Sequence, residues 1–202
     1  MSTARAPVEP VELAKGVFVV GGYPNRGVVA TGEGAVVVDT GLFPEAALHT
    51  LEVARRVDGA GPRFLINTHF HGDHTMGNGL FGPGTAVVAH EETATYMARH
   101  GEGHYRYLRE FFGEGLGGAK VVVPCVTFRR EVTLRPGGRT IRVLHLGSGH
   151  TAGDAVVYLP EERLVFAGDL VFARTVPYME DAHCETWIGT LGRLLELDAL
   201  TF

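Results

Sequence analysis

The sequence His69-Phe70-His71-Gly72-Asp73-His74 places three imidazoles and one carboxylate within six residues. The apolar segment before it, Phe64 to Asn67, is predicted to be a β-strand. In an extended segment the side chains at positions i and i+2 point the same way, so His69 and His71 can bind one ion. Gly72 lets the chain turn, and Asp73 and His74 then point in a new direction. This spacing predicts a metal site that holds two neighbouring ions, or one ion beside an acid.

Further ligands are expected from strand ends elsewhere in the chain. His150 lies in a glycine-lined loop, Gly147 to Asp154, between two predicted strands. Asp169 directly follows a predicted apolar strand, where a carboxylate is costly unless it is paired or binds a cation. Asp39 also follows an apolar strand, and we interpret it as a residue that orients a ligand imidazole. Imidazole and carboxylate together favour zinc, and they also suit iron or manganese.

Other polar side chains are assigned structural roles. Asp154 is expected to be a hydrogen-bonding partner of its own loop. Cys184 directly follows His183, and adjacent residues rarely face each other as a nucleophile and its base. Five histidines are expected to lie outside the metal site, in a helix, at strand positions or in exposed polar segments: His49, His90, His100, His104 and His145.

The composition is that of a globular protein without a charged binding surface. The net charge is −5, and no basic cluster occurs that would bind nucleic acid or an anionic membrane. No apolar run is long enough to cross a bilayer, and the N-terminus lacks the pattern of a signal peptide. The chain has 2 cysteines, too few for a disulfide framework. We therefore predict a cytoplasmic protein that acts on a small molecule, and leave its oligomeric state open.

The spacing of apolar residues predicts short strands interspersed with helices. Residues 1–10 are expected to be a flexible tail, and residues 11–202 a single domain. Helices are predicted over Pro44–Val57, Glu91–His100, Tyr105–Phe112 and Glu185–Leu197. Strands are predicted over Val17–Val20, Gly27–Thr31, Ala35–Val38, Phe64–Asn67, Ala86–Ala89, Val121–Val123, Glu131–Leu134, Arg139–Leu144, Ala155–Leu159 and Leu164–Ala167. This alternation favours a layered α/β domain with mixed sheets.

Together these motifs resemble the metallo-β-lactamase superfamily, whose hallmark is H-x-H-x-D-H followed by a later His and a later Asp. The similar segments are Val36–Gly41, Asn67–His74, Gly149–Asp154 and Ala167–Asp169. The resemblance implies a four-layer αββα sandwich with two mixed β-sheets. It also implies a first metal ion held by His69, His71 and His150. A second ion would be held by Asp73, His74 and a bridging Asp169.

The resemblance implies one more ligand, which this sequence does not contain. The superfamily supplies a further His from a Gly-His-Gly turn after its last strand, but no His follows His183 here. His183 precedes the last predicted helix, so we do not expect it to be the equivalent residue. We therefore expect that the chain is truncated at its C-terminus, with an incomplete second metal site as the alternative.

The function implied by the resemblance is hydrolysis at a binuclear zinc centre. A zinc-activated hydroxide would attack an ester, thioester, lactone or amide bond, the amide of a lactam included. Asp73 would be catalytic, because it would orient the hydroxide and move a proton to the leaving group. Two alternatives stay open: an oxidoreductase with one iron ion, similar to persulfide dioxygenases, and a module that binds metal without activity.

Overall fold

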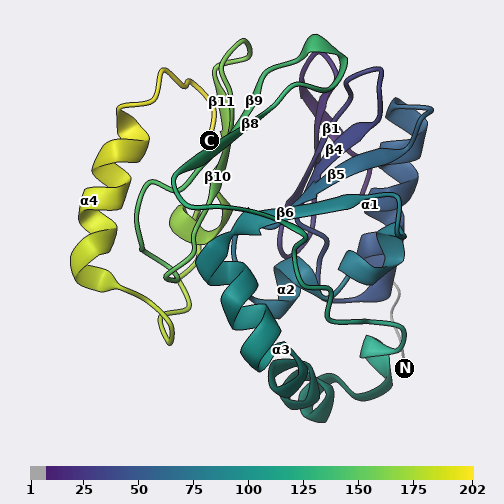
Figure 1. The fold of residues 1–202 in the computed structure, drawn as a ribbon, viewed down its shortest axis with the longest axis vertical. Helices are drawn as coiled ribbons and strands as arrows, with labels where there is room; N and C mark the ends of the chain where they lie inside the picture. Colours follow the sequence, from purple (N-terminus) through teal and green to yellow (C-terminus); the bar gives the residue numbers. More distant parts are fainter. Residues whose placement is uncertain (1–7) are drawn as a thin grey trace.

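Residues 11–128 contain a seven-stranded β-sheet, part of which is labelled in Figure 1, and its strands follow one another in sequence order. The computed structural model describes residues 8–202, so most of the predicted tail at residues 1–10 lies outside the described residues. Neighbours from β1 to β4 pair antiparallel, and neighbours from β4 to β7 pair parallel. The strands are β1 (Val11–Ala14), β2 (Val17–Val20), β3 (Arg26–Val29), β4 (Ala35–Val38), β5 (Pro62–Ile66), β6 (Ala86–His90) and β7 (Val126–Phe128).

The C-terminal half forms a second sheet of four strands in the order β11-β10-β9-β8. Its ladders are antiparallel, and a parallel bridge joins Thr201 to Leu164 at the β11 edge. The strands are β8 (Glu131–Leu134), β9 (Ile141–Leu144), β10 (Val156–Leu159) and β11 (Leu164–Phe166).

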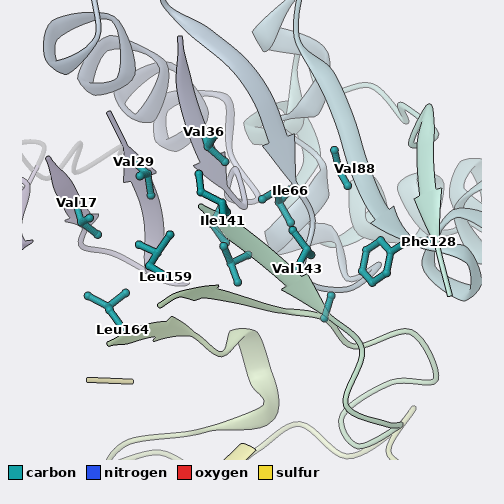
Figure 2. Close-up of a cluster of buried hydrophobic side chains, with 13 residues drawn as sticks. Val17, Val29, Val36, Ile66, Val88, Phe128, Ile141, Val143, Leu159 and Leu164 are labelled. Carbon is teal, nitrogen blue, oxygen red and sulfur yellow. The ribbon is translucent and has the colours of Figure 1, made fainter. Parts of the chain in front are cut away.

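Alternating side chains on the strands build a core between the two sheets. Along β4, Val36 and Val38 point toward the second sheet, whereas Ala35 and Val37 point toward a helix. Figure 2 shows Val36 facing side chains of the second sheet, Leu159 among them. The buried members of this cluster are Val17, Val29, Val36, Val38, Ile66, Val88, Phe128, Ile141, Val143, Ala155, Val157, Leu159 and Leu164.

One helix covers the outer face of each sheet. Helix α1 (Pro44–Val57) packs Ala47, Leu51 and Ala54 against the first sheet. Helix α4 (Cys184–Leu195) packs Trp187 and Leu194 against the second sheet, as Figure 1 shows at its yellow end. The layers therefore follow the order helix, sheet, sheet, helix, and the predicted four-layer αββα sandwich is confirmed.

The structure corrects two predictions on the segment between β6 and β7. The helices expected over Glu91–His100 and Tyr105–Phe112 form one helix, α3 (Glu91–Phe112), which continues through Gly101. A side chain at that glycine would lie 2.6 Å from Cγ1 of Val121, so the glycine allows close packing rather than ending the helix. The strand predicted over Val121–Val123 is absent from the described residues, and β7 begins later at Val126.

Short helical segments complete the fold. Helix α2 (Gly72–Thr75) contains part of the His-rich run and lies against α3. The 3-10 helices are η1 (Asn78–Phe81), η2 (Gly113–Leu116), η3 (Pro136–Gly138) and η4 (Gly168–Leu170). Among residues 8–202, no helix combines the length and the apolar character that a membrane span requires.

His90 joins β6 to α3 and is buried away from the His-rich run. Its Nδ1 accepts a hydrogen bond from the backbone N–H of Glu92, and its Nε2 donates one to the carbonyl of Arg129. Its ring stacks on that of His145, with 3.9 Å between ring centroids. Burial lowers the pKa of His90, and the neighbouring His145 lowers it further. The native state therefore favours a neutral His90.

We expect His90 to make the protein less stable at acidic pH. Its contribution to the free energy of unfolding is fully present above the unfolded pKa of about 6.5, and is lost as pH falls toward the lowered native pKa. Urea unfolding between about pH 5 and pH 8 should therefore show a shallower loss of stability in His90→Gln than in the wild type. If the free energy of unfolding fell equally with pH in both proteins, His90 would not be a cause of the acid sensitivity.

Candidate metal centre

The structure brings all six predicted ligands together where the strands of both sheets end. His69, His71, Asp73 and His74 follow β5, and the last two lie in α2. His150 lies in the loop between β9 and β10, and Asp169 lies in η4 after β11. Segments that follow strands of both sheets therefore contribute side chains to one centre, which has two half-centres: His69, His71 and His150 form the first, and Asp73, His74 and Asp169 form the second.

The first half-centre contains three buried imidazoles. Nδ1 of His71 lies 3.1 Å from Nε2 of His69 and 2.9 Å from Nε2 of His150. A neutral imidazole has one nitrogen that accepts, so three nitrogens that face one another need a proton or a cation between them. Nitrogen ligands in this arrangement fit a divalent cation such as zinc.

The second half-centre joins His74 to two carboxylates. Nε2 of His74 lies 3.3 Å from Oδ1 of Asp169 and 3.5 Å from Oδ2 of Asp73. This nitrogen is buried and has no partner with hydrogen-bond geometry among residues 8–202. His69, His74 and Asp169 have ligand atoms within 4.8 Å of one another, close enough to share a cation. A buried nitrogen without a hydrogen bond, beside two carboxylates, fits a second cation.

Asp39 holds the imidazole of His74 directly, in agreement with the sequence prediction, and reaches that of His69 through Thr68. Its Oδ2 lies 2.7 Å from Nδ1 of His74, and its two oxygens accept hydrogen bonds from the backbone N–H and hydroxyl of Thr68. The Thr68 hydroxyl lies 3.1 Å from Nδ1 of His69. Because Nδ1 of each imidazole is engaged in this way, Nε2 of each is left to face the centre.

Asp154 holds the loop that carries His150, which confirms its predicted structural role. Its carboxylate accepts hydrogen bonds from the backbone N–H groups of Gly149 and Thr151 and from the Thr151 hydroxyl. Burial raises the pKa of Asp154 to about 6, against the opposing effect of these hydrogen bonds.

The imidazoles of the centre differ in the direction in which their pKa is shifted. Burial and the neighbouring imidazoles hold the pKa of His69 well below its usual value, and burial and His71 lower that of His150 to about 4. Burial alone would lower the pKa of His74, but the carboxylates of Asp39 and Asp73 raise it well above its usual value. His69 and His150 are therefore neutral at pH 7, the state in which imidazole binds metal.

Comparison with known proteins agrees with this geometry. A sequence model of the metallo-β-lactamase superfamily matches residues 19–202. The chain belongs to this superfamily. The resemblance inferred from the His-rich run, the His150 loop and Asp169 is thereby confirmed.

Two curated proteins are similar to most of the chain. The α subunit of 2,4-dinitroanisole O-demethylase from Nocardioides sp. (strain JS1661) is 30% identical over 172 residues, which cover 82% of this chain and 47% of that protein. The hydroxyacylglutathione hydrolase of Synechococcus sp. (strain JA-3-3Ab) is 27% identical over 68% of this chain and 46% of its own length. The chain thus spans about half the length of these curated relatives.

A solved structure extends the comparison to the fold. The metallo-β-lactamase from Pontibacter korlensis superposes with a TM-score of 0.74 and is 26% identical, over 93% of this chain and 85% of that one. The superposition covers nearly the whole chain, so the fold is that of the metallo-β-lactamase superfamily.

Three features of the candidate centre differ from the sequence predictions or add to them. Asp181, which the sequence did not single out, lies 2.9 Å from Nε2 of His71. His104 was predicted to be exposed, but it is half-buried and its Nε2 is fully covered. Gly72 lies in the first turn of α2, where a side chain would approach Cδ1 of Leu108 to 2.3 Å. Close packing of α3 favours a glycine there, whereas its φ is not positive, so the change of direction does not itself need one.

Gly168→Ala is expected to weaken both the fold and the centre. Gly168 has φ of +54°, and an added Cβ would lie 2.7 Å from Cβ of Thr68, which orients His69. Because alanine is strained at positive φ, we expect the free energy of unfolding to fall by more than about 1 kcal/mol. Zinc affinity, measured by chelator competition, should fall as well.

Gly103→Ala is the matched control for this change. Gly103 lies exposed inside α3 with nothing within 4 Å of an added Cβ. Alanine has the higher helix propensity, so this variant should gain up to about 1 kcal/mol in stability and keep its zinc affinity. Equal effects of the two substitutions would contradict the role given to Gly168.

Proposed function

We propose that this chain is a metal-dependent hydrolase with two divalent cations, zinc in both positions, that cleaves an ester, thioester, lactone or amide bond of a small molecule. The observation that carries the proposal is the convergence of six buried or half-buried ligand side chains from both sheets. His69, His71 and His150 would hold the first ion. Asp73, His74 and Asp169 would hold the second.

The chemistry follows from the type of ligand. Zinc held by such a set lowers the pKa of a water molecule to about 7 and stabilises negative charge that develops on a substrate oxygen. Asp73 is the most exposed of the proposed ligands. Its side chain is 29% exposed, against 22% for Asp169 and 10% for His71. In this proposal Asp73 would orient the attacking water and would carry a proton to the leaving group.

A cavity of about 530 Å³ lies directly over Asp73, His74 and Asp169. Its other walls come from the loop around Tyr23 and from the segment after β11, with Phe172. This volume is in the range of small-molecule sites. The cavity supports a small-molecule substrate, in agreement with the hydrolase name carried by the Synechococcus relative.

Several parts of the proposal rest on the sequence. A cytoplasmic location is one, and the exposed free thiols of Cys125 and Cys184 are compatible with a reducing compartment. The chain spans about half the length of its curated relatives. We therefore also propose, as a separate step, that a longer protein that contains this chain would have the same activity.

Metal quantification with a substrate panel tests the proposal. Protein purified without chelator should contain between one and two equivalents of zinc and should hydrolyse at least one member of a panel of lactams, lactones, thioesters and phosphoesters. Dialysis against a chelator should remove the activity, and added zinc should restore it. A single equivalent of iron with oxygen uptake would instead favour the oxidoreductase alternative. Zinc binding without turnover of any substrate would favour the inactive module.

A further inference from the structure

The ring of His71 is held from both sides, although only one side faces the metal centre. Its Nδ1 faces His69 and His150, as described above, and its Nε2 lies 2.9 Å from Oδ2 of Asp181. A carboxylate accepts hydrogen bonds and cannot donate one when it is ionised. Asp181 therefore favours the His71 tautomer that carries its proton on Nε2 and leaves the Nδ1 lone pair toward the centre.

We infer that Asp181 is a positioning residue for the metal centre, which sets the tautomer and the ring orientation of His71. The inference rests on the proposed metal site. It assigns to this residue, 110 positions along the chain from His71, the role that Asp39 has for His74.

The backbone around Asp181 is anchored, so its carboxylate is held in place. The N–H of His183 donates to the carbonyl of Gly149 over 2.7 Å, and the N–H of Ala182 donates to the carbonyl of Met179 over 3.2 Å. Gly149 precedes the ligand His150. The same segment therefore connects two ligands of the first half-centre: it is bonded to the His150 loop through its backbone and to His71 through Asp181.

The other imidazoles show why a partner is expected at this position. Nδ1 of His74 is held by Asp39, and Nδ1 of His69 by the Thr68 hydroxyl. Such outer partners fix the tautomer of a ligand imidazole and raise its basicity. Asp39 is 3% exposed at its side chain, whereas Asp181 is 39% exposed. Asp181 can therefore be replaced with less damage to the core than Asp39.

The neighbouring acid provides a matched control. Glu180 lies in the same segment, but its carboxylate accepts a hydrogen bond from the Tyr178 hydroxyl rather than from His71. Glu180→Ala removes the same charge as Asp181→Ala, one residue away, without removing the contact with His71. A general effect of negative charge near the centre would therefore appear in both variants, and a positioning effect only in Asp181→Ala.

Two measurements test the inference. The first is the zinc dissociation constant by chelator competition, which Asp181→Ala should weaken by about 10- to 100-fold. Glu180→Ala should leave it unchanged, and Asp181→Asn should give an intermediate value because its amide oxygen still accepts from Nε2–H. The second is the long-range ¹H–¹⁵N spectrum of the His71 ring in the metal-free protein at about pH 8, where free imidazole is neutral. It should show one tautomer, with the proton on Nε2, in the wild type and a mixture of tautomers in Asp181→Ala.

The outcomes separate this inference from the proposed function. Wild-type zinc affinity in Asp181→Ala, or equal weakening in Asp181→Ala and Glu180→Ala, would overturn the role of Asp181. An Nδ1–H tautomer in the wild-type spectrum would do the same. A wild-type protein that binds no zinc would overturn the proposed function, and the ring spectrum would still report whether Asp181 sets the tautomer of His71.

Discussion

His71→Ala is expected to abolish hydrolysis and to remove most of the bound metal. Nδ1 of His71 is the atom that the other two imidazoles of the first half-centre both approach, at 3.1 Å and 2.9 Å. Replacing a residue that hydrogen-bonds to a metal ligand weakens metal affinity by about 10- to 100-fold. Loss of the ligand itself should therefore weaken metal affinity by more than about 100-fold. Elemental analysis after dialysis, and the rate on the best substrate of the panel, measure the two losses.

His100→Ala is the control for this variant. His100 is exposed on α3, and the proposed centre does not include it. The same substitution there should leave the metal content and the rate at their wild-type values. A His71→Ala protein that keeps its metal and its full activity would remove the basis of the metal-centre assignment.

Leu159→Ala is expected to lower the free energy of unfolding more than the other substitutions described. Leu159 is fully buried in β10 and points into the cluster between the sheets (Figure 2). Removal of its side chain takes away buried apolar contacts and leaves a cavity between two sheets that cannot collapse freely. We expect the free energy of unfolding to fall by about 2–5 kcal/mol. Urea unfolding, followed by circular dichroism, measures this change.

Leu195→Ala provides the same substitution at an exposed position. Leu195 is the last residue of α4 and is 75% exposed. Its replacement should change the free energy of unfolding by no more than about 0.5 kcal/mol. If Leu159→Ala were as mild as this control, the cluster around Leu159 would not be the principal core of the fold.

The sequence predicts those parts of the molecule whose residues interact locally or follow strand ends. The run from His69 to His74 is contiguous, so its ability to bind metal can be seen without knowledge of the fold. Asp169 and Asp39 are recognisable because each carboxylate follows an apolar strand, where it needs a partner, and His150 because it lies in a glycine-lined loop between two strands. Most predicted strands occur within one or two residues of their positions in the structure, since their apolar patterns are strong.

The parts that the sequence does not predict depend on packing between distant segments. Asp181 lies in a segment with no apolar pattern, and its partner His71 is 110 positions away, so no local signal identifies it. Gly101 suggests a break in α3, yet the close approach of Val121 makes a glycine favourable inside the helix. The apolar run Val121–Val123 suggests a strand, but Val122 packs into the cluster beside α1 instead of continuing a ladder. In each case a tertiary contact outweighs the local preference.

The division of the centre between the two sheets has a consequence for folding. His71 and His150 are 79 positions apart along the chain, and each follows a strand of a different sheet. Bringing two residues this far apart together costs conformational entropy, and contacts between the imidazoles offset little of that cost. We therefore expect the sheets to dock before the imidazoles meet. We therefore expect the centre to follow docking of the sheets rather than to start folding, as the metal site of a zinc finger does. We expect it to form late in folding, so that its geometry would report whether the two sheets have reached their native register.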